Sequence, residues 1–363
     1  MAVVTILGTG FTGATQCFFG AVGVTISLNA AGTSFTCIPP AGSGTVSISI
    51  TSAFGSSVVG TGVQGYTYMA PPTTSSLGTT MGPVAGGTSV VITGTNFYNR
   101  QFAPNSNEAF PGVTLPVAFG ITASTGGVIN STSSVTVSTP AFATITGGAV
   151  TVNLNTPTGT ASTLLYTYIA LPTLTNTSFG PAGASGPLGG GTQLRIIGTN
   201  LSTTSGVTMA GTKGATLESI NASGVTLLSP PSTTEGAKSI VVTTAGGTAS
   251  GITFTYVALP DIDVNGIVPA AGTTSGGTPV TITGSKLSNP QYVLFGITAA
   301  SSTTSNTTGA TLIAVSPQSL STGLVGIFVR TAGGTGTLSN AYEYLGAMTI
   351  TSITPNRGPT GGG

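Results

Sequence analysis

A strand motif occurs three times within this 363-residue chain, and two halves of the same motif stand at its ends. The internal copies start at Gly86, Gly190 and Gly276, where a Pro/Gly-rich lead-in runs directly into an apolar stretch. Residues 348–363 contain a lead-in that ends in three glycines, whereas residues 2–11 contain a strand without a lead-in. Self-similarity at a fixed period indicates a row of similar small units. The sequence therefore predicts a string of domains, one of which is divided between the two ends.

The spacing of an aromatic strand signature sets the domain boundaries. From Tyr168 to Tyr256 is 88 residues, and from Tyr256 to Tyr344 is again 88. The interval from Tyr68 to Tyr168 is 100, because the second repeat carries an inserted loop near 98–116. The expected domains are 1–68, which lacks its first strand; 69–168, with the inserted loop; 169–256; 257–344; and 345–363, a donor strand that completes the first domain of a neighbouring subunit.

Composition and patterning predict an all-β protein. Stretches such as Val90–Ile92, Val135–Val137 and Val280–Ile282 are rich in β-branched residues, and Gly, Pro, Asn and Ser clusters separate them at short intervals. Hydrophobic residues make up 39% of the chain, enough to bury a core. No apolar run reaches the roughly 18 residues of a membrane helix, so no membrane span is expected. We expect tandem immunoglobulin-like β-sandwiches in an elongated string.

The three internal repeats combine a Pro/Gly-rich lead-in, a G-G-T strand that ends in glycine, a short strand and a closing Y-x-Y, which is Phe254-Thr255-Tyr256 in the third repeat. This pattern resembles the IPT/TIG domain, an immunoglobulin-like fold of plexin ectodomains, bacterial surface proteins and some transcription factors. The resemblance covers nearly the whole chain, and the third repeat departs from it with Met209-Ala210 in place of Phe-Gly. It implies the fold and an extracellular or cell-surface location. It leaves function open, because this fold serves binding, spacing and assembly alike.

The two cysteines, Cys17 and Cys37, stand at places that cell-surface members of this family often bridge. The resemblance therefore implies a disulfide within the divided domain, and hence an oxidising compartment. The alternative is two buried free thiols in apolar positions.

The inventory of reactive side chains argues against an enzyme. The chain has no His, so a Ser-His-Asp arrangement or a His-containing zinc site cannot form. Asp261 to Gly266 resembles the start of an EF-hand loop, but Gly272 stands where that loop needs a bidentate Glu. The 7 Lys and Arg residues are scattered, whereas nucleic-acid binding needs clustered cations. We expect no catalytic residue, cofactor, metal or nucleic-acid partner.

The expected mechanism is self-assembly by donation of a β-strand. A sandwich without its first strand has an open sheet edge, which acts as a template for pairing. The donor residues are Met348, Ile350, Ile353, Pro355 and Pro359; the acceptor residues are Val4, Ile6 and Phe11. A head-to-tail contact of this kind builds a filament unless it closes into a ring. The predicted partner is therefore a second copy of the chain, in an extracellular or pilus-like fibre.

Two other functions stay open on sequence alone. The chain fits a fragment of a longer tandem-repeat adhesin, stalk or surface-layer protein, or a module that binds carbohydrate or a receptor. The inserted loop is the candidate surface for lateral copies or surface glycans, because aromatic residues and Arg are enriched at interface hot spots. Its candidate contact residues are Tyr98, Arg100, Phe102 and Phe110. Alternatively, this loop folds back over its own sandwich.

Overall fold

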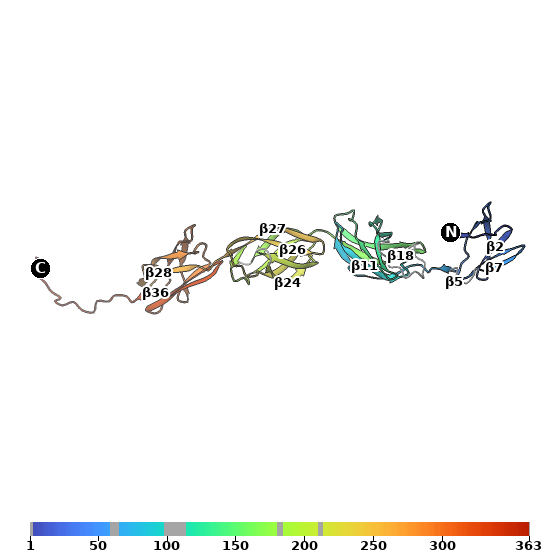
Figure 1. The fold of residues 1–363 in the computed structure, drawn as a ribbon. Coiled ribbons are helices and arrows are strands. Elements are labelled where there is room, and N and C mark those ends of the chain that lie inside the picture. The colour runs from blue at the N-terminus through green and yellow to red at the C-terminus, as the bar shows by residue number, and fades with distance from the viewer. Residues whose placement is uncertain (1–2, 59–64, 98–113, 180–183, 210–212, 363) are drawn as a thin grey trace. The chain divides into compact units, whose positions relative to one another are not determined.

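The computed structural model describes residues 3–58, 65–97, 114–179, 184–209 and 213–362. The regular elements of these residues are β-strands, as the sequence predicted (Figure 1). The chain divides into two compact units, Met1–Ile169 and Ala170–Gly363, and each is described by itself. Each unit contains two hydrophobic cores. The five boundaries expected from the repeat spacing remain predictions.

The second sandwich, in the first unit, has two five-stranded sheets around one core. One sheet has the order β10 (Met81–Pro83), β18 (Gly159–Ile169), β17 (Gly147–Thr156), β13 (Val117–Phe119), β14 (Thr122–Ala123); the other has β12 (Thr114–Leu115), β15 (Gly127–Ser131), β16 (Ser134–Ser138), β11 (Ser89–Thr95), β9 (Thr73–Leu77). Alternate side chains of β11 point inward, and Val90 and Ile92 are completely buried. The period-2 pattern of the sequence thus defines the core face.

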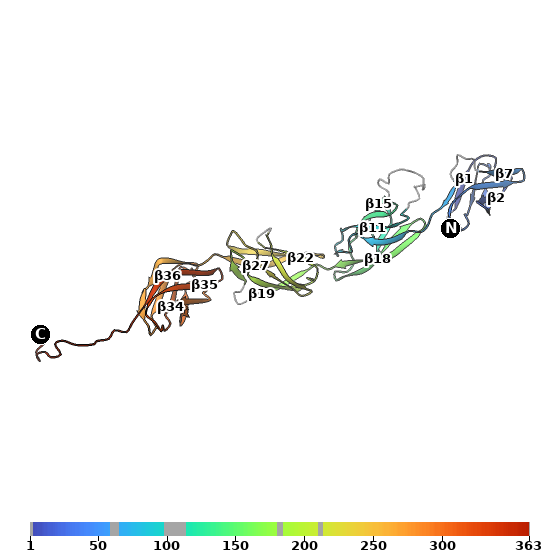
Figure 2. The ribbon, with the colours of Figure 1, turned by 90° about the horizontal axis from the view of Figure 1, so that it is seen from below.

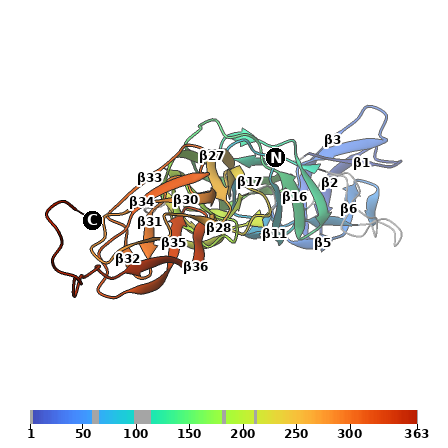
Figure 3. The same ribbon diagram turned by 90° about the vertical axis from the view of Figure 1, so that its left-hand side faces the viewer.

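The second unit contains two further sandwiches, each with one four-stranded and one five-stranded sheet. In the third sandwich, the four-stranded sheet has the order β19 (Thr173–Phe179), β21 (Gln193–Thr199), β25 (Gly224–Leu228), β24 (Thr216–Asn221). Its five-stranded sheet has the order β20 (Ser185–Pro187), β27 (Gly247–Val257), β26 (Gly236–Thr244), β22 (Thr204–Met209), β23 (Lys213–Gly214). The sheets of the fourth (Figure 3) are β28 (Asp261–Val268), β30 (Pro279–Ser285), β34 (Thr311–Val315), β33 (Ser302–Ser305), and β29 (Ala271–Thr273), β36 (Gly334–Leu345), β35 (Gly323–Thr331), β31 (Tyr292–Phe295), β32 (Thr298–Ala299). Met209 is fully buried, so it serves as a core residue where other repeats have Phe. The segment that resembles the start of an EF-hand loop, Asp261 to Gly266, lies within β28.

The first segment of each complete sandwich contributes to both of its sheets. It pairs antiparallel with the next strand of one sheet, then forms a short strand parallel to the closing strand of the other. The same close approach recurs in the antiparallel pair of each complete sandwich. A Cβ on Gly94, Gly198 or Gly284 would lie 1.9, 1.9 or 2.0 Å from the carbonyl oxygen of the residue that begins the first strand. The glycine of the repeated motif is therefore required by close backbone approach.

The first sandwich is built differently. Its main sheet has the order β1 (Val4–Leu7), β4 (Ser34–Cys37), β3 (Val22–Leu28), β2 (Ala14–Phe19), β6 (Ile48–Ser52), β7 (Gly55–Val58), and a separate pair joins β5 (Gly44–Val46) to β8 (Tyr66–Tyr68). Strand β1 lies at the edge of the sheet (Figure 2). Among the described residues, no first strand pairs with β1 and no parallel strand pairs with β8.

The C-terminal segment 346–362 follows β36 without entering a sheet (Figure 1). Its apolar side chains are solvent-exposed: Met348 is 101%, Ile350 84% and Ile353 68% accessible. These are the three apolar donor residues that the sequence predicted, and no strand pairing within the second unit covers them.

The paired aromatic residues of the closing strands have different roles. The hydroxyl of the second tyrosine donates to a proline carbonyl, as in Tyr344 Oη to Pro317 O at 2.9 Å and Tyr256 Oη to Pro230 O at 2.6 Å. Burial raises the pKa of Tyr344 to about 12, and the neighbouring Tyr342 contributes to the rise. The buried hydroxyl of Tyr342 has no hydrogen-bond partner among the described residues. Phe254 occupies the same place in the third sandwich.

This difference predicts unequal effects for two similar substitutions. Tyr344→Phe should lower the free energy of unfolding by about 1–2 kcal/mol, because the carbonyl of Pro317 loses its buried donor. Tyr342→Phe is the matched control and should cost nothing, because its hydroxyl makes no bond. Urea denaturation of the two variants measures both effects. Equal losses would show that the hydrogen bond to Pro317 does not stabilise the fourth sandwich.

Candidate functional site

The first sandwich is incompletely buried along β1. Each residue of β1 has a counterpart at the same distance from the glycine that ends the motif. This glycine is Gly8 in the first sandwich and Gly94, Gly198 or Gly284 in the complete sandwiches. Val4 and Ile6 are partly exposed, as is Phe11, which packs edge-on against Phe35 with ring centroids 5.1 Å apart. Their counterparts in the three complete sandwiches are 0–1% exposed: Val90, Leu194, Val280; Ile92, Ile196, Ile282; Phe97, Leu201, Leu287. The structure thus places all three predicted acceptor residues in one partly open core.

The closing strand of the first sandwich is open as well. Tyr66 and Tyr68 in β8 are partly exposed, whereas their counterparts are 0–2% exposed: Tyr166, Phe254, Tyr342; Tyr168, Tyr256, Tyr344. The Tyr68 hydroxyl has no hydrogen-bond partner among the described residues. Phe19 and Phe35, by contrast, are 3% and 1% exposed. The loss of burial therefore falls where the two strands of the complete sandwiches would lie.

Sequence reasoning did not single out Tyr66 and Tyr68 as part of the incompletely buried core. The missed signal was the Gly-Pro lead-in, which in the complete sandwiches packs against these aromatic positions. A Cβ on Gly82 would lie 2.2 Å from the Tyr166 hydroxyl, and one on Gly186 would lie 2.8 Å from the Phe254 ring.

A depression of about 510 Å³ opens on the same sandwich. Its apolar lining comes from Val3, which precedes β1, together with Val24 and Ile26 of β3 and Ile38 after β4. The depression therefore adds apolar surface next to the unpaired edge.

The two cysteines lie on neighbouring parts of this core. Cys17 in β2 and Cys37 in β4 are 0% and 4% exposed and carry free thiols. Burial raises the pKa of Cys17 to about 12, and the Cys37 thiol adds to the rise. Burial also raises the pKa of Cys37. The two thiols are close enough to interact, and the predicted disulfide between them remains a prediction.

The proposed contact residues of the inserted loop, Tyr98, Arg100, Phe102 and Phe110, lie outside the described residues. The donor residues Pro355 and Pro359 lie in the exposed C-terminal segment. Among the described residues, no group of three or more His, Cys, Asp or Glu side chains could hold a metal ion. No helix in the described part of the chain is long and apolar enough to span a membrane.

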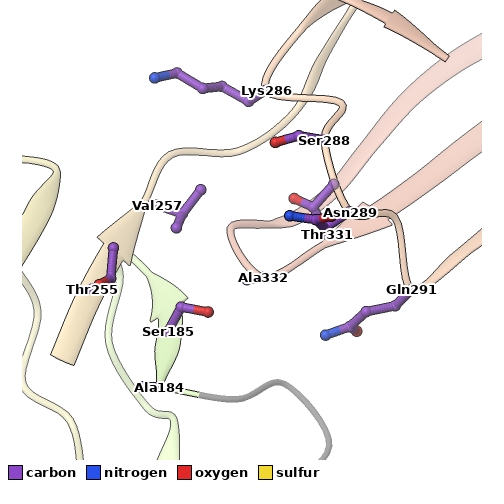
Figure 4. Close-up of a pocket in the computed structure, with 10 residues that line it drawn as sticks. All are labelled: Ala184, Ser185, Thr255, Val257, Lys286, Ser288, Asn289, Gln291, Thr331 and Ala332. Carbon is purple, nitrogen blue, oxygen red and sulfur yellow. The ribbon is translucent and has the colours of Figure 1, made fainter. Parts of the chain in front are cut away.

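The second unit contains a polar cavity of about 620 Å³ (Figure 4). Its lining includes Lys286, Asn289 and Gln291. These groups already have protein partners: Lys286 Nζ lies 2.6 Å from Glu235 Oε2, and Gln291 Oε1 accepts from Arg330 Nε at 3.3 Å. Among the described lining residues the charged one is Lys286, which is in an ion pair with Glu235.

The sheets and cores define the class of protein as a tandem array of immunoglobulin-like β-sandwiches. Within this class, the IPT/TIG domain family matches residues 174–256 and 263–344. This match confirms the resemblance drawn from the repeated motif. No curated protein matches the sequence.

Similar solved structures include a plexin, an adhesin and a protein of a xyloglucan utilization locus. The extracellular region of plexin A4 is 15% identical, with a TM-score of 0.38, over 92% of this chain and 36% of that one. The Escherichia coli adhesin FdeC is also 15% identical, with a TM-score of 0.27, over 75% of this chain and 99% of that one. The surface protein SGBP-B of Bacteroides uniformis is 21% identical, with a TM-score of 0.22, over 47% and 49%. The chain thus spans about a third of the plexin. The TM-scores are low, so the domain type is taken from the family match and not from these structures.

Proposed function

We propose that this protein is a structural subunit of an extracellular filament that grows head-to-tail. The C-terminal segment of one copy completes the first sandwich of the next copy. One observation carries the proposal: the core of the first sandwich is only partly covered at Val4, Ile6, Tyr66 and Tyr68, whereas the matching positions are buried in every complete sandwich. Filling such an edge adds main-chain hydrogen bonds and buries apolar side chains.

The complete sandwiches supply the register of the donated strand. Thr73 and Thr173 each follow the closing tyrosine by five residues, and their hydroxyls lie 2.7 Å from those of Thr95 and Thr199. Thr349 follows Tyr344 by the same interval. Thr9 follows Gly8 as Thr95 follows Gly94. We therefore place Thr349 opposite Thr9, with the same pair of hydroxyls.

This register brings the apolar side chains of the donor to core positions. Ile353 follows Thr349 by four residues and lies opposite Ile6, as Leu77 follows Thr73 by four residues and lies opposite Ile92 in the second sandwich. Leu77 is partly buried and packs against the core. Ile350 takes the place of Ile262, which is 6% exposed. The exposed tail thus has the spacing of the first strand of the second sandwich.

The lead-in of the tail has a matching site. Residues 358–363 read G-P-T-G-G-G, and residues 186–191 of the third sandwich read G-P-L-G-G-G. Gly186 pairs with Tyr256 in a parallel ladder. Gly358 takes the corresponding place beside Tyr68, where it covers Tyr66. A single copy contains no neighbouring acceptor, so an unpaired tail is the expected state before assembly.

Charge composition supports association between copies. Charged residues are 4% of the chain and the net charge is +1, so electrostatic repulsion between copies is weak. A head-to-tail contact uses two different surfaces and continues indefinitely unless it closes.

Negative-stain electron microscopy of the purified chain tests the proposal. We expect filaments, and their number should rise with protein concentration. Cross-linking of mixed isotopically labelled and unlabelled chains should join the tail of one copy to β1 of another. Isolated rods without such cross-links would contradict donation between copies. Rods that bind glycans would instead support a surface module of an adhesin or a glycan-binding protein.

A further inference from the structure

In each complete sandwich, the linker that enters the domain lies against a hairpin of that domain. The hairpins join β17 to β18, β26 to β27, and β35 to β36. A threonine hydroxyl organises each turn: Thr156, Thr244 and Thr331 each accept from the backbone N–H two residues later. The third residue of the turn is Thr158, Gly246 or Gly333. We call it the hairpin-tip residue.

In the second and fourth sandwiches the linker residue opposite this tip is alanine. Thr158 Oγ1 donates to the carbonyl of Ala70 at 3.2 Å. A Cβ on Gly333 would lie 1.8 Å from the carbonyl oxygen of Ala258. In the third sandwich the contact is displaced by one residue on each side, since a Cβ on Gly247 would lie 2.8 Å from the Leu171 side chain. A Thr or Gly tip therefore lies against an alanine of the linker in two of the joints.

The first sandwich has the same hairpin between β6 and β7, with a different tip. Ser52 accepts from the backbone N–H of the tip residue at 3.2 Å and donates to the carbonyl of Gly55 at 3.2 Å, as Thr244 does to Gly247. Gly55 has a φ of 131°, close to the 125° of Gly247. The tip is Phe54, which is 91% exposed. No atom lies within 4 Å of a Cβ built on Gly55.

The C-terminal linker differs at the matching position. Ala70, Ala170 and Ala258 each follow the closing tyrosine by two residues, whereas the tail has Gly346 at that interval after Tyr344. The large tip and the small linker residue thus occur on the two surfaces that strand donation would join. At the internal joints, by contrast, the tip residue is Thr or Gly and the linker residue is the larger alanine.

We propose that Phe54 is a docking residue for the linker of a second copy, and that Gly346 is the residue on which its ring packs. The inference rests on the proposed function, and it adds a contact outside the donated strand. An exposed aromatic ring gains much from burial at an interface. An alanine in the linker would place its Cβ against the ring, because closely packed surfaces leave no room for an added methyl. The contact also distinguishes the C-terminal linker from the three internal ones.

Peptide binding to the full chain tests the contact. The acceptor is the full chain carrying Ile350→Asp and Ile353→Asp, so that it cannot donate its own tail. The probe is a fluorescent peptide of residues 345–363, and anisotropy reports its affinity. Phe54→Thr in the acceptor should weaken binding about tenfold, a typical loss for an interface aromatic. Gly346→Ala in the peptide should weaken binding to the Phe54 acceptor by a similar factor.

The two changes together separate packing from a general effect. The Phe54→Thr acceptor has the Thr tip of the second sandwich, so the Gly346→Ala peptide should bind it no more weakly than the unchanged peptide does. If the unchanged peptide bound the Phe54 acceptor and the Phe54→Thr acceptor with equal affinity, the docking role of Phe54 would be overturned. The binding itself would still support strand donation. Strictly additive losses would overturn it too. Absence of peptide binding to either acceptor would overturn the proposed function along with it.

Discussion

Replacing Ile350 and Ile353 with aspartate is expected to abolish filament growth while the complete sandwiches stay folded. In the free chain both side chains are exposed, 84% and 68%, so aspartate there costs little. In the assembled state the same positions face an apolar core, where an unpaired carboxylate costs several kcal/mol. The affinity of tail for acceptor should therefore fall by roughly a thousandfold or more. Electron microscopy and sedimentation velocity measure the loss.

The chain offers a control with the same added charge. Thr351 and Ser352 take the positions of Ser75 and Ser76, which are exposed in the second sandwich. The Thr351→Asp, Ser352→Asp variant should still form filaments, because its carboxylates point to solvent. If both variants fail, charge rather than core packing controls assembly. If the isoleucine variant still grows, the donated strand is not the connection between subunits.

Oxidation of Cys17 and Cys37 is expected to raise the free energy of unfolding of the first sandwich by about 3 kcal/mol. A bridge between these residues closes a loop of about 20 residues, and loop closure of this size has an effect of that order. The first sandwich gains most from a bridge because its core is the incomplete one. Denaturation with and without reductant measures the difference, and a peptide map without reductant identifies the bridge.

The reduced form should respond to pH in a defined direction. Burial raises the pKa of Cys17 from its ordinary value of 9.0 to about 12, so the folded state keeps a proton that the unfolded state releases. Stability of the reduced sandwich is therefore complete below pH 9 and falls as the pH rises toward 12. The bridged form has no thiol to ionise and should lack this fall. Cys17→Val with Cys37→Val is the control, because it should respond neither to reductant nor through these thiols to pH. Rapid alkylation of both cysteines in the native protein would contradict the bridge.

Sequence reasoning reached much of the candidate site. It predicted Val4, Ile6 and Phe11 as acceptor residues, and the structure places them in one partly open core. Its assignment of Ile350 and Ile353 to a donor strand stays a prediction. These assignments were possible because strands alternate with period 2 and because the motif repeats at fixed intervals. Each of these signals is contained in a short stretch of chain or in the distance between two stretches.

The sequence alone determined the all-β class, the repeat and the matching halves at the two ends, because patterning and spacing are properties of the chain in order. Only the tertiary structure decided that Tyr66 and Tyr68 lose burial, and that Phe54 stands at the place where other sandwiches receive a linker. Burial depends on segments far apart in the chain. Phe54 reads as one more exposed apolar residue until its turn is compared with those at Thr158 and Gly333.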